Sequence, residues 1–354
     1  MGTAHSGRQT IQQLLNIDVP IIQAPMAGVQ GAELAAAVSN AGGLGSLPCA
    51  MLSPEALETE LARLTAATDK PFNVNFFCHT VPTVTAQQSR SWRERLSPYF
   101  EELHVEPPRD DAGVSREPFG DAALAVLERC KPAVVSFHFG LPEPAQLKRL
   151  KSWGAHIMAS ATTVEEARWL ADHGADIIIA QGLEAGGHRG SFLTLDMTTQ
   201  TGTLAFVPRV CAAVSVPVVA AGGIASAEGV AAAMTLGAAG AQIGTAFLLC
   251  PEANTSILHR AALKSEAAQH TALTNVFTGR PARGIVNRLV REVGPMTDAA
   301  SPFPSAAGPV SLLRATAEAN GSSDFTPLWS GQNTSGCREI PAAELLQRLV
   351  KAQR

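Results

Sequence analysis

The chain has 354 residues, 46% of them hydrophobic, which is enough for one barrel-sized domain or two ordinary ones. Its 27 Lys and Arg against 31 Asp and Glu give a formal net charge of -4, and no basic run is interleaved with aromatic residues, so nucleic acid is not an expected partner. Residues 1–15 lack the apolar stretch of a signal peptide, and no later segment is apolar over the length of a membrane helix. We expect a soluble, cytoplasmic protein without a membrane partner.

The six cysteines are scattered along the chain without a CxxC pair. A disulfide-rich or zinc-binding protein would bring its cysteines together in the sequence. We therefore expect small apolar core residues in a reducing compartment, and no metal site.

Short apolar segments alternate along the chain with helical segments rich in Ala, Leu and Glu. The segments predicted as strands cover residues 19–25, 44–47, 71–77, 132–140, 155–160, 176–181, 216–223 and 240–245. Among the helices between them, one begins at Ser53 and Pro54, typical of an N-cap and first helical residue, and another ends before Gly174. The alternation predicts parallel strands with crossover helices, an α/β protein of the TIM-type (β/α)8 barrel class.

Two regions interrupt this rhythm: a polar, proline-bearing interval from about His79 to Gly120, and the Pro- and Gly-rich part after Cys250. Long irregular segments at the mouth of a barrel usually carry function. We predict that residues 1–76 and 132–250 form the barrel, and that the insertion 77–131 and the C-terminal extension 251–354 form a smaller cap and substrate region.

Paired glycine turns follow the last two predicted strands, AGGI at 221–224 and QIGT at 242–245. Glycine lets a backbone approach a ligand closely, and in barrels the loops after strands seven and eight bind phosphate. One such turn alone is equally typical of a plain tight turn. No GxGxxG motif follows the first strand, so the phosphate is expected to belong to a mononucleotide such as FMN rather than to a dinucleotide.

Other strand ends supply groups suited to a flavin ring. An amide donates and accepts at once, which matches the alternating N–H and C=O groups of the isoalloxazine edge, although a single amide can equally be a satisfied polar group of the core. The candidates at these ends are Ala24, Pro25, Met26, Asn75, Ser136, His138 and Gln181.

The sixth strand runs into GLEAGGHRG, residues 182–190, which contains a histidine and an arginine among four glycines. Such a loop at a strand end lies at the barrel mouth, where His188 can take a proton from a weak carbon acid or stabilise an anion. Arg189 adds a fixed positive charge or pairs with Glu184. On residue type alone, His188 is as often structural as catalytic; His138 is the second candidate, as a substrate or flavin contact.

These segments resemble those of the nitronate monooxygenases, formerly called 2-nitropropane dioxygenases. The similarity covers most of the barrel through residues 23–47, 72–77, 136–140, 181–190, 218–224 and 237–249, and continues in TGRPARGIVNR at 278–288 and LWSGQ at 328–332. The AGGHRG loop resembles the branch whose loop histidine is the catalytic base. A related branch, which includes NADH:quinone reductases, has its histidine just after the fifth strand, where this chain reads MASATTVEEA.

The resemblance implies noncovalent FMN, no metal, and oxidation of alkyl nitronates by O2 to a carbonyl compound and nitrite, with propionate 3-nitronate as a natural substrate. It makes His188 the catalytic base and places His138, with Ser136, in the substrate pocket. The residues implied to hold FMN are Ala24, Pro25, Met26, Asn75, Gln181, Gly186, Gly187, Gly222, Gly223, Gln242, Gly244 and Thr245.

One departure concerns the tyrosines that the family often places in the C-terminal part of the pocket. This chain has a single tyrosine, Tyr99, in the predicted insertion. Phe303, Phe325 and Trp329 are the candidates to replace them.

Three other functions use the same features. An NAD(P)H-dependent FMN reductase of the enoyl-thioester or quinone type shares the barrel and the glycine turns. A flavin-free lyase or isomerase would use those turns for a substrate phosphate. A non-catalytic sensor of FMN or nitro compounds is disfavoured, because no DNA-binding or partner-helix segment is present to transmit a signal.

Overall fold

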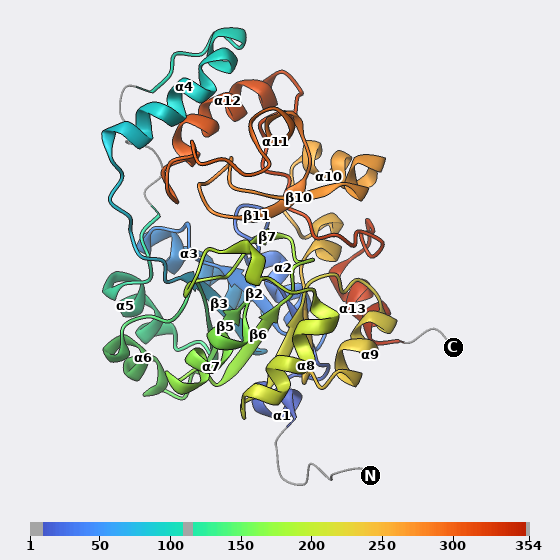
Figure 1. Cartoon of the computed structure of the whole chain (residues 1–354). Coiled ribbons are helices and arrows are strands. Elements are labelled where there is room, and N and C mark those ends of the chain that lie inside the picture. The colour runs from blue at the N-terminus through green and yellow to red at the C-terminus, as the bar shows by residue number, and fades with distance from the viewer. Residues whose placement is uncertain (1–9, 109–115, 352–354) are drawn as a thin grey trace.

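The computed structural model describes residues 10–108 and 116–351 (Figure 1). Most of the N-terminal stretch that enters the signal-peptide argument lies outside this part. No helix of the described residues is long and apolar enough to cross a membrane. All six cysteines are free thiols, each buried or partly buried.

Eight parallel strands form the central sheet, in the order β1-β9-β8-β6-β5-β4-β3-β2. Ile22 in β1 forms a parallel bridge with Leu44 just before β2, so the two edges of the sheet meet. The predicted (β/α)8 barrel is confirmed. Its strands are β1 (Ile21–Gln23), β2 (Gly45–Pro48), β3 (Phe72–Phe77), β4 (Val134–His138), β5 (His156–Ala161), β6 (Ile177–Gln181), β8 (Val218–Ala221) and β9 (Gly240–Ile243).

Both faces of the barrel strands are buried, so most of their side chains are apolar, and the polar ones gather toward the interior and the mouth. Side chains such as Val134, Met158 and Ile179 fill the interior, where Ile11 and Leu15 of α1 (Ile11–Leu15) join them. In Figure 1, α1 lies at the end of the barrel opposite the small sheet. This packing leaves the carboxyl ends of the strands as the open mouth.

Helices surround the barrel, and the two predicted boundaries are confirmed. Ser53 is the N-cap of α3 and accepts a hydrogen bond from the backbone N–H of Ala56, while Gly174 takes a φ of 104° just beyond α7. The surrounding helices are α2 (Ala32–Asn40), α3 (Pro54–Ala67), α5 (Asp121–Cys130), α6 (Pro144–Lys151), α7 (Val164–Asp172), α8 (Thr203–Ala213) and α9 (Ala227–Thr235), with short 3-10 turns at Met197–Thr199 and Thr245–Leu249.

Helices of the insertion and the extension pack together above the barrel mouth (Figure 1). Trp92 and Leu96 of α4 (Ala86–Glu102) share one apolar core with Val310 and Leu313 of α12 (Ala307–Ala319). We call this unit the cap. Its other elements are α10 (Ile257–Lys264), a 3-10 turn at Glu266–Gln269, β10 (Thr271–Thr274), β11 (Ala282–Ile285) and α11 (Arg288–Val293).

Not every helix of the insertion and extension lies in the cap. Helix α5 contacts α3 and α6, and α13 (Ala342–Val350) contacts α2 and α9, so both belong to the outer layer of the barrel. The reason is amphipathicity: α13, for example, buries Leu345, Leu346 and Leu349 against barrel helices. The predicted boundaries between the barrel and the cap region, at residues 76, 131 and 250, stay a prediction.

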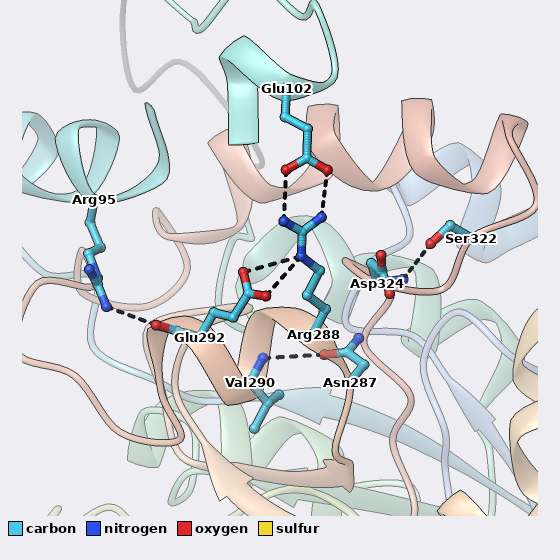
Figure 2. A network of polar contacts seen from close by, with 8 residues as sticks. All are labelled: Arg95, Glu102, Asn287, Arg288, Val290, Glu292, Ser322 and Asp324. Atoms are coloured by element: carbon cyan, nitrogen blue, oxygen red, sulfur yellow. Dashed lines mark hydrogen bonds and ion pairs between the residues drawn. The ribbon is translucent and has the colours of Figure 1, made fainter. Parts of the chain in front are cut away.

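An ion-pair network on the cap surface joins α4 to α11. Both terminal nitrogens of Arg288 donate to the carboxylate of Glu102, at 2.6 and 2.7 Å, and its Nε donates to Glu292 (Figure 2). Arg95 of α4 donates to the backbone carbonyl of Glu292 at 2.9 Å. These groups are partly exposed, so water and salt screen the ion pairs and the buried apolar contacts carry most of the stability.

Trp92 tests whether buried contacts stabilise the cap more than the surface ion pairs do. Its side chain is 1% exposed, and its Nε1 donates to the carbonyl of Ala306 at 3.0 Å. We expect Trp92→Ala to lower the free energy of unfolding by about 3–5 kcal/mol. Urea denaturation followed by circular dichroism measures it. Arg288→Gln is expected to cause a much smaller loss; an equal loss would mean that the ion pairs hold the cap.

Candidate active site

A cavity opens at the carboxyl ends of the barrel strands, beneath a small antiparallel sheet of order β10-β11-β7. Strand β7 is Gly187–His188, part of the glycine loop after β6, and it pairs with β11 so that His188 lies opposite Ala282 and Gly187 opposite Arg283. The C-terminal extension thus fixes the loop that the sequence singled out.

The cavity brings together all but one of the predicted site residues. Those that line it are Ala24, Pro25, Met26, Asn75, His138, Gln181, Gly186, Gly187, His188, Gly222, Gly223, Gln242, Gly244 and Thr245.

Ser136, predicted for the substrate pocket, does not line the cavity. Its side chain is fully buried, and its hydroxyl accepts a hydrogen bond from Nδ2 of Asn75 at 2.9 Å. The prediction was wrong because residues two apart on a strand share a face but not a depth: Ser136 points into the barrel like His138 but lies one layer deeper. It supports Asn75 from below.

His188 has one ring nitrogen occupied and one free. Its Nε2 lies 2.9 Å from Oγ1 of Thr278, and Nδ1 has no hydrogen-bond partner among the described residues. In the tautomer in which Nε2 donates to Oγ1, Nδ1 keeps a free lone pair, as a base requires.

The backbone of His188 is held from the barrel side. Its carbonyl accepts hydrogen bonds from Nε2 of His138 at 3.1 Å and from Nε2 of Gln181 at 3.0 Å. The carbonyl oxygen of the Gln181 side chain accepts from the backbone N–H of Gly190 at 2.8 Å. Gln181 was predicted as a flavin contact. One N–H and the oxygen of its side-chain amide hold the loop in position.

Arg189 points away from the cavity into the core. It is fully buried and donates to the carbonyls of Gln181 and Gly182, each at 2.7 Å, and to Oε1 of Gln200 at 2.9 Å. Burial lowers its pKa to about 9. The hypothesis of pairing with Glu184 was wrong, because the Glu184 carboxylate accepts hydrogen bonds from the backbone N–H and hydroxyl of Thr203.

Burial decides the protonation of His138 and His188, the two predicted histidines of the cavity. It lowers the pKa of His188 well below its ordinary value, and the positive charges of Arg116 and Arg280 lower that pKa further. Burial also lowers the pKa of His138 to about 4. Both rings are therefore neutral near pH 7, which suits His188 to receive a proton and His138 to donate its Nε2–H to the loop carbonyl.

The opposite wall of the cavity has unpaired polar groups that fit a phosphorylated ring system. The backbone N–H groups of Gly222, Gly223 and Gly244 donate no hydrogen bond within the described residues, and Oε1 of Gln242 is buried without a partner. Buried polar groups of this kind are normally satisfied, so a ligand is expected to complete them. The geometry fits FMN, with its phosphate at the glycine turns.

Two aromatic side chains of the extension lie beside His188. The ring centroid of Phe303 is 5.5 Å and that of Trp329 is 5.4 Å from the imidazole. Phe325 instead packs against Tyr99 at 5.3 Å inside the cap core. Of the three candidates to replace the family's tyrosines, the structure brings Phe303 and Trp329 to the site.

Sequence reasoning missed four polar side chains that line the cavity: Arg116, Ser160, His259 and Asn333. Nε2 of His259 bonds to the carbonyl of Trp329 at 3.1 Å, and Asn333 donates to the carbonyl of Gly223 at 2.9 Å. Arg116 and Asn333 lie in irregular segments, whereas His259 lies on helix α10 of the cap. The available signal concerned Asn333 alone, which directly follows LWSGQ, a segment that resembles the family.

A family model and several known proteins are similar to this chain over nearly its whole length. The family model described as nitronate monooxygenase matches residues 8–352. The chain belongs to the nitronate monooxygenase family. It is 43% identical over 348 residues to the nitronate monooxygenase of Pseudomonas aeruginosa, a match that covers 97% of this chain and 98% of that relative. It is therefore a flavin-dependent enzyme that acts on nitronates with O2.

Solved structures of similar fold include a nitroalkane oxidase from Streptomyces ansochromogenes, with a TM-score of 0.86 and 40% sequence identity over 94% of this chain and 95% of that one. FabK from Thermotoga maritima has a TM-score of 0.74 and 28% identity, with 97% and 96% of the two chains covered. Both likenesses extend over barrel and cap together.

Gly190 provides a test of the loop geometry. A Cβ on this residue would lie 2.8 Å from Cε1 of His138 and 3.0 Å from Cβ of Ser160. We expect Gly190→Ala to displace the His138 ring and lower kcat on nitronates by about 10-fold or more, because small misplacements at an active site are costly. Gly120→Ala is the control, since a Cβ there meets no atom closer than 3.8 Å. Unchanged kcat in Gly190→Ala would contradict the tight contact.

Proposed function

We propose that this nitronate monooxygenase binds FMN and oxidises small alkyl nitronates, propionate 3-nitronate among them, to a carbonyl compound and nitrite. The observation that carries the proposal is the neutral His188, whose Nδ1 is free in a cavity lined by unpaired glycine N–H groups. The chemistry that FMN supplies when bound is to accept electrons from the nitronate and pass them to oxygen.

In this proposal the residues of the far wall hold the cofactor. The N–H groups of Gly222, Gly223 and Gly244, with Thr245, bind the phosphate, while Gln242 and Asn75 offer amide groups to the ring edge. Ala24, Pro25 and Met26 line the same cavity at the end of β1. Gly186 is required to be small, because a Cβ there would lie 2.5 Å from the backbone nitrogen of Gly331.

His188 acts on a neutral nitroalkane by taking the α-proton from carbon onto Nδ1. The step leaves an imidazolium and a nitronate anion in the same cavity. A histidine of low pKa is a weak base, so the attraction between the two new charges, and that of Arg116 and Arg280 for the anion, must favour the transfer. Thr278 is a positioning residue that fixes the proton on Nε2.

Oxygen uptake by the purified protein tests the function. With propionate 3-nitronate and no NADH or NADPH, we expect O2 consumption with release of nitrite, and the flavin extracted from the protein to have the mass of FMN. Uptake that requires NAD(P)H would favour the reductase hypothesis instead. A protein that binds no added FMN would exclude both.

His188→Asn tests the role of the base. We expect kcat/KM to fall by roughly 100- to 10,000-fold with a neutral nitroalkane, because proton abstraction is lost, and by less than about 10-fold with the corresponding nitronate, which arrives deprotonated. Steady-state oxygen uptake on both substrates measures the split, with FMN content as the control for folding. Equal losses on the two substrates would show that His188 binds the anion and is not the base.

A further inference from the structure

Arg116 is a cavity-lining arginine without a counter-ion among the described residues. Its Nε is buried with no hydrogen-bond partner, and burial lowers the pKa of the guanidinium. The carbon of the guanidinium lies 5.6 Å from the ring centroid of Phe303, the ring that also lies beside His188. A buried cation in this state is costly unless a ligand neutralises it.

Arg280 adds a second positive charge to the same end of the cavity. Its guanidinium stacks 4.0 Å from the ring centroid of Phe139, and it donates to the carbonyl of Ser191, but its Nε is buried without a partner. The stacked Arg280 side chain thus joins the loop at Ser191 to the Phe139 ring. Among the residues that the structure describes, the Arg116 side chain contacts the Phe303 ring and has no other structural role, so it is the arginine available to a ligand.

The carboxylates nearest to these cations are already engaged or lie toward the surface. Glu166 is fully buried and accepts hydrogen bonds from Thr162 and from the backbone N–H groups of Phe192 and Leu193. Glu117, which interacts electrostatically with His79, is exposed. All the charged groups that act on His188 are cations or other histidines. The cavity therefore has more positive charge than a single nitronate neutralises.

We propose that Arg116 binds a second anionic group of the substrate, a carboxylate joined to the nitronate carbon by a short alkyl chain. This inference rests on the proposed function. Guanidinium and carboxylate form paired hydrogen bonds in one plane, and their mutual attraction is strong where water is displaced. Arg116 then sets the preference for carboxylated nitronates over simple alkyl nitronates, while His188 and the flavin-binding residues act on the nitro end of either.

The experiment compares propionate 3-nitronate with butyl nitronate, which lacks the carboxylate. For Arg116→Gln we expect kcat/KM on propionate 3-nitronate to fall about 10- to 100-fold, mainly through KM, with less than about 3-fold change on butyl nitronate. Arg116→Lys keeps the charge and should recover part of the loss. Arg129→Gln removes an equal charge from the exposed pair with Glu58 on the outer layer and should change neither substrate.

Succinate provides a readout independent of turnover. Its binding, followed through the absorbance of the bound flavin, is expected to weaken at least 10-fold in Arg116→Gln and to stay unchanged in Arg129→Gln. Equal losses on both nitronates, or unchanged succinate binding, would overturn the carboxylate site. If the wild-type enzyme oxidises no nitronate, the proposed function fails, and the succinate titration still decides whether Arg116 binds carboxylate.

Discussion

The site depends on the double attachment of strand β7. Gly187 and His188 leave the barrel after β6, pair with β11 of the C-terminal extension, and return to the core at Arg189. The carbonyl of His188 accepts two hydrogen bonds from barrel side chains, while its imidazole meets Thr278 of the extension. Loss of either attachment would free the His188 side chain, so the geometry of the site depends on barrel and cap together.

The buried polar groups around this loop each have a defined task. Arg189 and Glu166 lie in the core and satisfy backbone groups on either side of the loop, where an unpaired charge would be destabilising. Their hydrogen bonds hold the glycine-rich loop in place, although the loop has few side chains of its own to pack. Such support pre-organises His188 for the role of base that we propose, since a loop free to move would cost orientation at every turnover.

Desolvation gives the cavity its electrostatic character. The same burial that keeps His188 neutral leaves Arg116 and Arg280 as the fixed charges, so the cavity favours anions. Phe303 and Trp329 take the positions beside the imidazole and exclude water without offering a phenol hydroxyl. With these two rings beside the imidazole, the group that recognises the negative charge of a ligand is a guanidinium and not a neutral hydroxyl.

The sequence by itself determined the barrel and the glycine turns and singled out His188 as a candidate, because strand periodicity and glycine at strand ends are local properties of the chain. It did not determine the depth of Ser136 in the barrel, the burial of Arg189, or the arrival of Arg116 and Asn333 at the cavity. Those positions depend on contacts between segments far apart in the chain, such as Asn333 with Gly223. Irregular segments have no periodicity from which such contacts follow, so only the tertiary structure decided them.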